Sequence, residues 1–255
     1  MTTDEPTHRN IEPHPVLPTY YADPSQRPAF VRNLFNRTAP FYDRINRLFS
    51  LGTGDWYRRH ALLRAGLQPG MRVLDVAVGT GLTARQALRI AGDDAVIGLD
   101  VSEAMLAEAR RTLAIPLIQG RAEQLPLADA SLDFLCMGYA LRHVADLTAT
   151  FREFRRVLRP GGRVLLLEIG RPRAGLPQAV AGLYLGRIVP FLSRCMTLDR
   201  ESQTLMRYYW DTIETCVPPE IILSAMREAG LADAACGEEF GMFRAYSGRA
   251  ATAAA

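Results

Sequence analysis

The sequence predicts an α/β fold in which a mostly parallel β-sheet lies between two layers of helices. Short apolar runs, typical of buried strands, alternate with segments of helical periodicity, and this alternation favours a three-layer sandwich. The expected strands are 71–76, 95–99, 115–119, 132–137 and 163–168. The expected helices are 81–91, 103–112, 147–158 and 219–229. A chain of 255 residues is long enough to enclose one large core of this kind.

The two ends of the chain differ in composition from this alternating part. Residues 1–28 are rich in Pro, Thr and His and lack periodicity, which predicts a flexible N-terminal arm. Tyr20 and Tyr21 would either anchor this arm on the body or fold over a site. The Ala-rich residues 250–255 are expected to be disordered, so that the folded domain covers 29–249.

The first part of this domain shows a helical pattern. From Pro28 to Phe49 apolar residues recur at spacings of three and four, and Pro40 is expected to break the segment into two helices. Gly52 and Gly54 would end the second helix, and a third is expected over 56–65.

Charge and cysteine spacing restrict the partners. All 30 basic residues are scattered arginines and the net charge is only +3, so no nucleic-acid partner is expected. The four cysteines, Cys136, Cys195, Cys216 and Cys236, are far apart and form no C-x-x-C pair. We therefore expect free thiols in a reducing compartment and no metal site.

Hydropathy suggests where the protein works. No apolar run reaches membrane-spanning length, and the N-terminus lacks the apolar core of a signal peptide. The expectation is a cytoplasmic protein, with contact at the inner face of the membrane left open.

The most informative stretch runs from Val73 to Leu82, where a buried strand turns tightly into a helix. Gly79 and Gly81 leave the backbone N–H groups of the turn open to a close ligand. The spacing differs from the G-x-G-x-x-G of dinucleotide-binding turns, and Asp75 would repel a pyrophosphate but could meet a cation. This acidic-then-small pattern resembles motif I of the class I S-adenosylmethionine-dependent methyltransferases.

The next strand ends in Asp100, 19 residues after Gly81, where a carboxylate can accept both hydroxyls of a ribose. Ser102 is expected to cap the following helix. Together with motif I, the resemblance implies a set of residues for the nucleoside and amino-acid parts of the cofactor. They are Asp75, Ala77, Gly79, Thr80, Gly81, Asp100, Val101 and Met105.

Three further segments resemble the ubiquinone/menaquinone C-methyltransferase family, and the resemblance spans residues 28–248. The first is Ala39-Pro40-x-Tyr42-Asp43-x-x-Asn46, with Trp56-Tyr57-Arg58-Arg59 after it. The second is Arg121-Ala122-Glu123-Gln124-Leu125-Pro126, in which Arg121 replaces a small hydrogen-bond acceptor. The third is Gly138-Tyr139-Ala140-Leu141-Arg142-His143-Val144-Ala145-Asp146, in which Tyr139, Ala140 and His143 depart from the family pattern.

The family resemblance implies a Rossmann-like class I methyltransferase fold. Its sheet would have seven strands with an antiparallel last strand, completed by strands near 232–238 and 241–247. Helical segments at about 29–65 and 171–217 would cover the substrate. Arg121, Ala122, Glu123 and Gly138 would lie beside the adenine and complete the cofactor site. The implied cofactor is S-adenosylmethionine, with S-adenosylhomocysteine as product and no metal.

By resemblance, the expected reaction is C-methylation of a quinol or related phenolic ring in lipid quinone biosynthesis. Because a phenol carbon becomes nucleophilic as its hydroxyl loses a proton, a base is needed near the methyl group. Our hypothesis makes His143 this base, directly or through water, while Arg142 and Tyr42 orient the phenolate. Two alternatives stay open: another small-molecule acceptor, such as a phospholipid amine or a specialised aromatic metabolite, and a non-catalytic cofactor-binding accessory protein. A homodimer is also left open.

Overall fold

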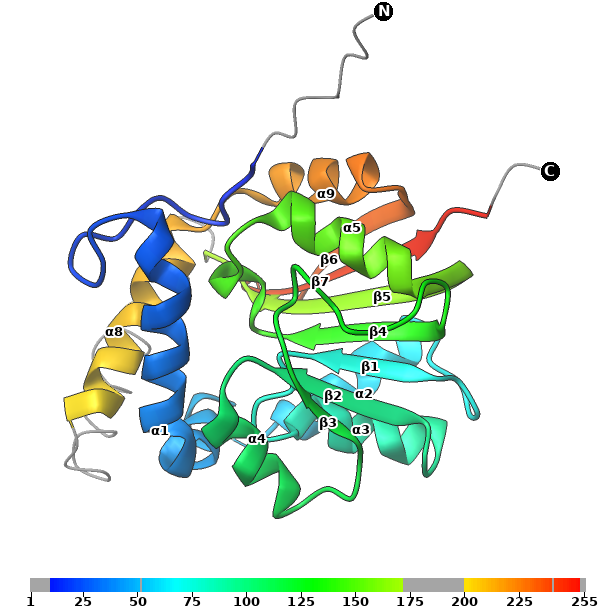
Figure 1. The fold of residues 1–255 in the computed structure, drawn as a ribbon, viewed down its shortest axis with the longest axis horizontal. Helices are drawn as coiled ribbons and strands as arrows, with labels where there is room; N and C mark the ends of the chain where they lie inside the picture. Colours follow the sequence, from blue (N-terminus) through cyan, green and yellow to red (C-terminus); the bar gives the residue numbers. More distant parts are fainter. Residues whose placement is uncertain (1–9, 51, 172–199, 240, 253–255) are drawn as a thin grey trace, which may run out of the picture.

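The computed structural model describes residues 10–50, 52–171, 200–239 and 241–252, and these form one seven-stranded sheet with helices on both faces (Figure 1). The strand order is β3-β2-β1-β4-β5-β7-β6, and only β7 runs antiparallel to its neighbours. The strands are β1 (Val73–Val76), β2 (Val96–Asp100), β3 (Leu117–Gln119), β4 (Leu132–Gly138), β5 (Leu158–Ile169), β6 (Leu231–Glu239) and β7 (Phe243–Ala250). The expected three-layer α/β fold is therefore confirmed.

The helices form the two outer layers and a cover. They are α1 (Arg27–Ser50), α2 (Gly54–Arg64), α3 (Leu82–Ala91), α4 (Glu103–Arg110), α5 (Leu147–Val157), α8 (Arg200–Thr215) and α9 (Pro219–Glu228), with short 3-10 helices at Pro24–Gln26 and Leu141–His143. Figure 1 shows α5 and α9 on one face of the sheet and α1 beside α8 at the end to which β4 points. Within the cover expected at 29–65, α1 lies at the carboxyl ends of the parallel strands, whereas α2 packs with α3 on a face of the sheet. Of the cover expected at 171–217, residues 172–199 lie outside the described residues.

The core has two parts, one on each face of the sheet. Residues of the central strands alternate between them: Leu74 and Val76 pack with α5 and α9, whereas Val73 packs with α2 and α3. All four residues of β1 are buried, as expected for a strand between two parallel neighbours. The chain turns from β1 toward β2 in one direction and reaches β4 in the other, so the switch point of the sheet lies at the carboxyl end of β1.

Pro40 does not divide the first helix, contrary to the sequence expectation. It lies inside α1, which runs continuously from Arg27 to Ser50. Proline removes one hydrogen bond and crowds the preceding turn, a penalty of about 3 kcal/mol. Buried apolar residues on both sides of it, among them Leu34 and Ile45, hold the helix to the body and offset that penalty.

The N-terminal segment is anchored to the domain over residues 10–26 instead of extending as an arm. The backbone of Ile11 makes two hydrogen bonds to the start of α5. Its N–H donates to Asp146 Oδ1 at 3.2 Å, and its carbonyl accepts from Leu147 N at 2.9 Å. Tyr21 is buried beside Phe30 and packs against α8. This agrees with the anchoring alternative for Tyr21, while residues 1–9 lie outside the described part of the chain.

Arg27 fastens this segment. Its guanidinium is 1% exposed and donates to Glu12 Oε2 at 2.7 Å, to the His14 carbonyl at 3.0 Å and to the Val144 carbonyl at 3.5 Å. One buried cation therefore joins the N-terminal segment and α1 to the turn that follows β4.

We expect Arg27→Ala to lower the free energy of unfolding by about 2–3 kcal/mol, because it leaves buried carbonyls and a half-buried carboxylate without their cation. Urea unfolding followed by circular dichroism measures the change. Arg37→Ala is the control, since its pair with Glu201 is exposed and should contribute less than about 1 kcal/mol. Equal, small changes in both variants would contradict this role for Arg27.

Candidate active site

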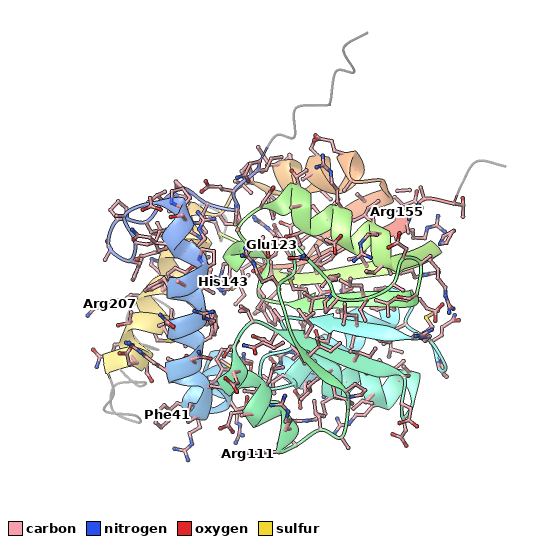
Figure 2. The ribbon with its side chains drawn as sticks, viewed as in Figure 1. Phe41, Arg111, Glu123, His143, Arg155 and Arg207 are labelled. Atoms are coloured by element: carbon pink, nitrogen blue, oxygen red, sulfur yellow. The ribbon has the colours of Figure 1, made fainter. Side chains whose placement is uncertain are left out.

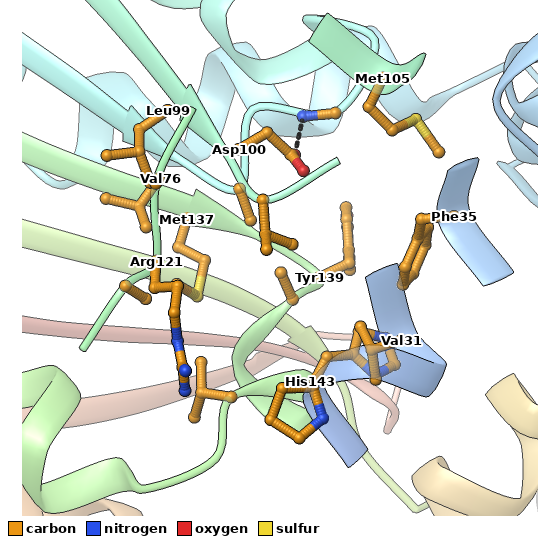
Figure 3. A pocket seen from close by; sticks show the side chains of 18 of the residues that line it. Val31, Phe35, Val76, Leu99, Asp100, Met105, Arg121, Met137, Tyr139 and His143 are labelled. Atoms are coloured by element: carbon orange, nitrogen blue, oxygen red, sulfur yellow. Dashed lines mark hydrogen bonds between the residues drawn. The ribbon is translucent and has the colours of Figure 1, made fainter. Parts of the chain in front are cut away.

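A cavity of about 840 Å³, part of it open to solvent, lies where the parallel strands end under α1. Its walls come from α1 and from the segments that follow β1, β2, β3 and β4 (Figure 3). It brings together most of the residues expected in the site: Tyr42, Ala77, Gly79, Asp100, Val101, Met105, Arg121, Ala122, Glu123, Gly138 and His143. Thr80 lines a smaller recess next to it. Asp75, Gly81 and Arg142 do not reach the cavity wall.

The turn after β1 has the open backbone that its sequence predicts. Ala77, Gly79 and Gly81 have φ values of 55°, 57° and 91°, in the left-handed region. At Gly81 the φ of 91° favours glycine, and a Cβ would also displace the Leu113 side chain, whereas a Cβ on Gly79 would meet no atom within 4 Å. The space beside Gly79 is therefore available to a ligand.

Asp100 ties this turn to the end of β2. One carboxylate oxygen accepts from Gly79 N at 2.8 Å and the other from Ser102 N at 2.8 Å, as Figure 3 shows for the first of these bonds. Burial raises the pKa of Asp100 to about 6, and the N–H groups of Ser102 and Gly79 limit the rise. The carboxylate is 7% exposed and lines the cavity, so its remaining lone pairs can accept hydrogen bonds from a diol.

Asp75 is buried behind the turn. Its Oδ1 accepts from the Cys136 thiol at 3.6 Å, and its Oδ2 has no partner among the described residues. Burial raises the pKa of Asp75 to about 7, with the nearby Asp100 adding to the rise and the Cys136 thiol opposing it. A buried carboxyl oxygen without a partner is costly, and an added cation or donor near the turn would relieve that cost.

The segment after β3 lines the cavity beside the Asp100 carboxylate. Arg121 is half exposed and its Nε lies 3.5 Å from Glu123 Oε2, so its side chain is paired with its own neighbour. Glu123 in turn accepts from Ala145 N at 2.6 Å, which fixes this segment to the turn after β4. Ala122 lines the cavity between these two charged residues.

His143 lies at the other end of the cavity from Asp100 and Met105, between the sheet and the α1–α8 pair (Figures 2 and 3). Its ring stacks on Tyr208 and Tyr209, with centroid distances of 5.3 and 5.8 Å, and meets the edge of Phe35 at 5.4 Å. Burial, followed by the charge of Arg142, holds the pKa of His143 well below 6.5. Neither ring nitrogen has a hydrogen-bond partner among the described residues, so a neutral imidazole is ready to bond a ligand.

Arg142 does not face the cavity, contrary to the sequence hypothesis. Its guanidinium is 1% exposed, forms an ion pair with Glu168, donates to Thr212 Oγ1 at 3.2 Å and lies over the Tyr209 ring at 5.0 Å. Glu168 also accepts from Leu141 N at 2.6 Å. The buried pair thus holds the turn after β4 and α8 in place, and the Arg142 side chain lies behind the wall of the cavity.

Tyr42 does line the cavity, and its hydroxyl accepts a hydrogen bond from the Tyr209 hydroxyl at 3.1 Å. From sequence, Tyr209 could either pack the cover onto the sheet or line an apolar pocket for a ring, and no role at the site was expected for Phe35 or Tyr139. Tyr209 belongs to an aromatic run that packing explained equally well, and Phe35 belongs to an ordinary helical repeat. Tyr139 is marked by the structure alone, in which its φ of 62° is uncommon for a residue with a side chain.

Comparison with known proteins decides the family. The model of the ubiE/COQ5 methyltransferase family matches residues 23–243. This chain belongs to that family. A ubiquinone/menaquinone biosynthesis C-methyltransferase of Coxiella burnetii is 33% identical over 239 residues, which cover 91% of each chain. A demethylmenaquinone methyltransferase of Symbiobacterium thermophilum is 40% identical over 157 residues, covering 58% of this chain and 62% of its own.

Solved structures agree on the fold. A possible histamine N-methyltransferase of Thermotoga maritima aligns with a TM-score of 0.60 and 21% identity, over 86% of this chain and 99% of its own. The expected family, methyltransferase class and class I fold are confirmed. Membership implies S-adenosylmethionine as methyl donor.

The residues of this methyltransferase fit such a donor. The Asp100 carboxylate suits a ribose, and the space at Gly79 admits a close ligand. Among the described residues, no cluster of three or more His, Cys, Asp or Glu side chains is arranged for a metal ion. Within the same part of the chain, no helix has the length and apolarity needed to cross a membrane.

Asp75 should make the stability of the ligand-free methyltransferase depend on pH. The pKa of Asp75 is raised, to about 7, so its proton stabilises the folded state fully below about pH 4, and this contribution is lost as the pH rises through about 7. Asp75→Asn mimics the protonated form at every pH. Its stability relative to wild type should therefore increase by about 2 kcal/mol between pH 5 and pH 8.

Urea titrations of both proteins at pH 5, 6, 7 and 8 measure this difference. Asp93→Asn, on the exposed loop between α3 and β2, is the control and should keep the wild-type profile. A constant difference between Asp75→Asn and wild type across this range would show that the Asp75 carboxyl is not desolvated.

Proposed function

We propose that this methyltransferase transfers the methyl group of S-adenosylmethionine to a ring carbon of a quinol with an apolar tail. The observation that carries the proposal is the single cavity that joins the Asp100 carboxylate to the aromatic-lined His143 imidazole. One end suits a nucleoside, and the other suits a ring that carries a hydroxyl group. The names of the relatives, which describe quinone-ring methylation, support the same acceptor for this chain.

Bound S-adenosylmethionine would supply a methyl group attached to a sulfonium. The acceptor would attack that methyl carbon in line, and the neutral sulfide would leave. The protein's task is to hold the acceptor carbon about 3 Å from the methyl and aligned with the departing sulfur. The residues between the two ends of the cavity are suited to a flat apolar ring, since Val31, Phe35 and Met137 line it.

His143 is the group proposed to handle the acceptor's proton. A neutral imidazole can accept a hydrogen bond from the acceptor hydroxyl and draw electron density into the ring. Its lowered pKa makes it too weak to remove a phenolic proton before methylation. As the new C–C bond forms, the hydroxyl becomes strongly acidic, and the proton can then pass to His143. The ring hydrogen at the methylated carbon then leaves to solvent as the one proton released overall, and protonated His143 returns its proton to the oxygen, which restores the aromatic quinol.

Tyr42 and Arg142 assist in different ways under this proposal. The Tyr42 hydroxyl faces the cavity and, held by Tyr209, can bond the acceptor oxygen. Arg142 is a positioning residue. Its guanidinium packs on the face of the Tyr209 ring, and its ion pair with Glu168 fixes the turn that carries His143.

A quinol with a polyprenyl tail is a membrane lipid, so we propose a cytoplasmic enzyme that works at the inner face of the membrane. Two large apolar side chains on α2, Trp56 and Leu63, are 61% and 47% exposed, which supports contact with an apolar surface.

Asp100 provides the first test of the cofactor site. We expect Asp100→Asn to bind S-adenosylhomocysteine about 10- to 100-fold more weakly, because a charged acceptor of two hydroxyls is replaced by an amide. Calorimetry measures the affinities, with Asp93→Asn as the control. Methyl transfer from labelled cofactor to demethylated quinols and to phospholipid amines then identifies the acceptor. Labelling of a quinol supports the proposal; labelling of the amine alone contradicts it, and binding without any transfer favours an accessory protein.

His143→Ala tests the proton handling. We expect kcat to fall about 10- to 100-fold with unchanged affinity for S-adenosylhomocysteine, since His143 lies at the acceptor end. His143→Asn keeps a hydrogen-bond acceptor and should retain more activity. Because the pKa of His143 is held well below 6.5, its protonation should cause no loss of rate between pH 6.5 and 8. Wild-type kcat in His143→Ala would remove His143 from the mechanism.

A further inference from the structure

A small recess adjoins the main cavity beside the turn after β1. It shares Tyr42, Gly79 and Gly138 with the cavity and adds Asn46, Arg58 and Thr80 to its wall. The recess therefore extends the cofactor end of the cavity toward α2. A ligand that occupied the space beside Gly79 would continue into it.

The wall of this recess contains a buried cation without a close counter-charge. Arg58 is 4% exposed, and its only ion-pair contact among the described residues is Asp55 Oδ1 at 4.0 Å, on a half-exposed side chain. Its Nη2 donates to the neutral amide oxygen of Asn46 at 3.0 Å, and its Nε has no hydrogen-bond partner in the part of the chain that the structure describes. A buried guanidinium in this state is costly, and an anion in the recess would relieve that cost.

The surrounding backbone is shaped to keep Arg58 at this place. The Arg58 guanidinium lies 5.3 Å from the centroid of the Tyr139 ring, and Tyr139 adopts the left-handed φ of 62°. Such a backbone costs about 1 kcal/mol or more and persists where other contacts over-determine it. A Cβ on Gly54 would stand 2.6 Å from Arg58 Nη1, so glycine leaves the room that the guanidinium occupies.

We propose that Arg58 binds the α-carboxylate of the amino-acid part of S-adenosylmethionine and of the product S-adenosylhomocysteine. The inference rests on the proposed function, since it assumes that cofactor. A guanidinium pairs with a carboxylate through two parallel hydrogen bonds, and the free Nε leaves one side of the fork available. Thr80, in the same wall, donates to Asp43 Oδ1 at 2.5 Å, which fixes the turn after β1 to α1 beside the recess.

The test compares S-adenosylhomocysteine with 5′-methylthioadenosine, which has the same nucleoside but no amino-acid part. We expect Arg58→Met to bind S-adenosylhomocysteine about 10- to 100-fold more weakly than wild type and to bind 5′-methylthioadenosine within about twofold. The affinity of Arg58→Lys for S-adenosylhomocysteine should lie between those of wild type and Arg58→Met, because lysine keeps the charge but lacks the planar fork of donors. Arg59→Met, on the exposed side of the same helix, should match wild type with both ligands. Calorimetry measures the affinities, and circular dichroism checks the fold of each variant.

Several outcomes would overturn the inference. Unchanged affinity of Arg58→Met for S-adenosylhomocysteine would show that Arg58 does not contact the ligand. Equal weakening for both ligands would make Arg58 a structural residue of the turn. If wild type bound the two ligands equally well, the amino-acid part would contribute nothing, and Arg58 would lose its role while the cofactor site stood. If wild type bound neither, the proposed cofactor and this inference would fail together.

Discussion

The Asp100 carboxylate is the contact on which the arrangement of the site depends. It accepts from Gly79 N and Ser102 N at once, so it joins the turn after β1 to the start of α4 across two strands. The same two loops are also bonded to α1. The Ser102 hydroxyl donates to Asn36 Oδ1, and the Thr80 hydroxyl donates to Asp43 Oδ1. The cover helix and the cofactor loops are therefore one hydrogen-bonded unit, and a ligand at Asp100 would act on both.

The site contains several buried ionisable groups whose charged forms are destabilised by the loss of water. Asp75 and Asp100 both have raised pKa values because water is excluded from them, and Arg58 is buried with little compensation. Arg142 and Glu168 differ, since each neutralises the other and neither needs a ligand. The two kinds of buried charge therefore differ in role. A buried ion pair holds the loop in place, whereas a buried charge that lacks a close counter-charge would be stabilised by a ligand of opposite charge.

Much of this was predictable from sequence because it depends on local pattern. The alternation of apolar runs and helical segments predicted the strands to within a few residues, and the small residues around Gly79 predicted an open turn. What failed depends on distant contacts. Pro40 was expected to break a helix, but packing on both of its sides keeps α1 continuous. Arg142 was expected at the cavity, but its partner Glu168 comes from β5, 26 residues later, and no local signal announces that pair.

The turn after β4 shows why a departure from the family pattern can be accommodated. His143 is one of the residues that depart from the family pattern, and its ring occupies an apolar slot. Tyr208 and Tyr209 of α8 and Phe35 of α1 form that slot, while Arg142 anchors the neighbouring residue. Those rings keep the imidazole dry and neutral, and neither nitrogen has a hydrogen-bond partner within the described part of the chain. Under the proposed function, the hydrogen bond of this weakly basic group would come from the acceptor's oxygen, so the shape of the slot would bear on which acceptor fits.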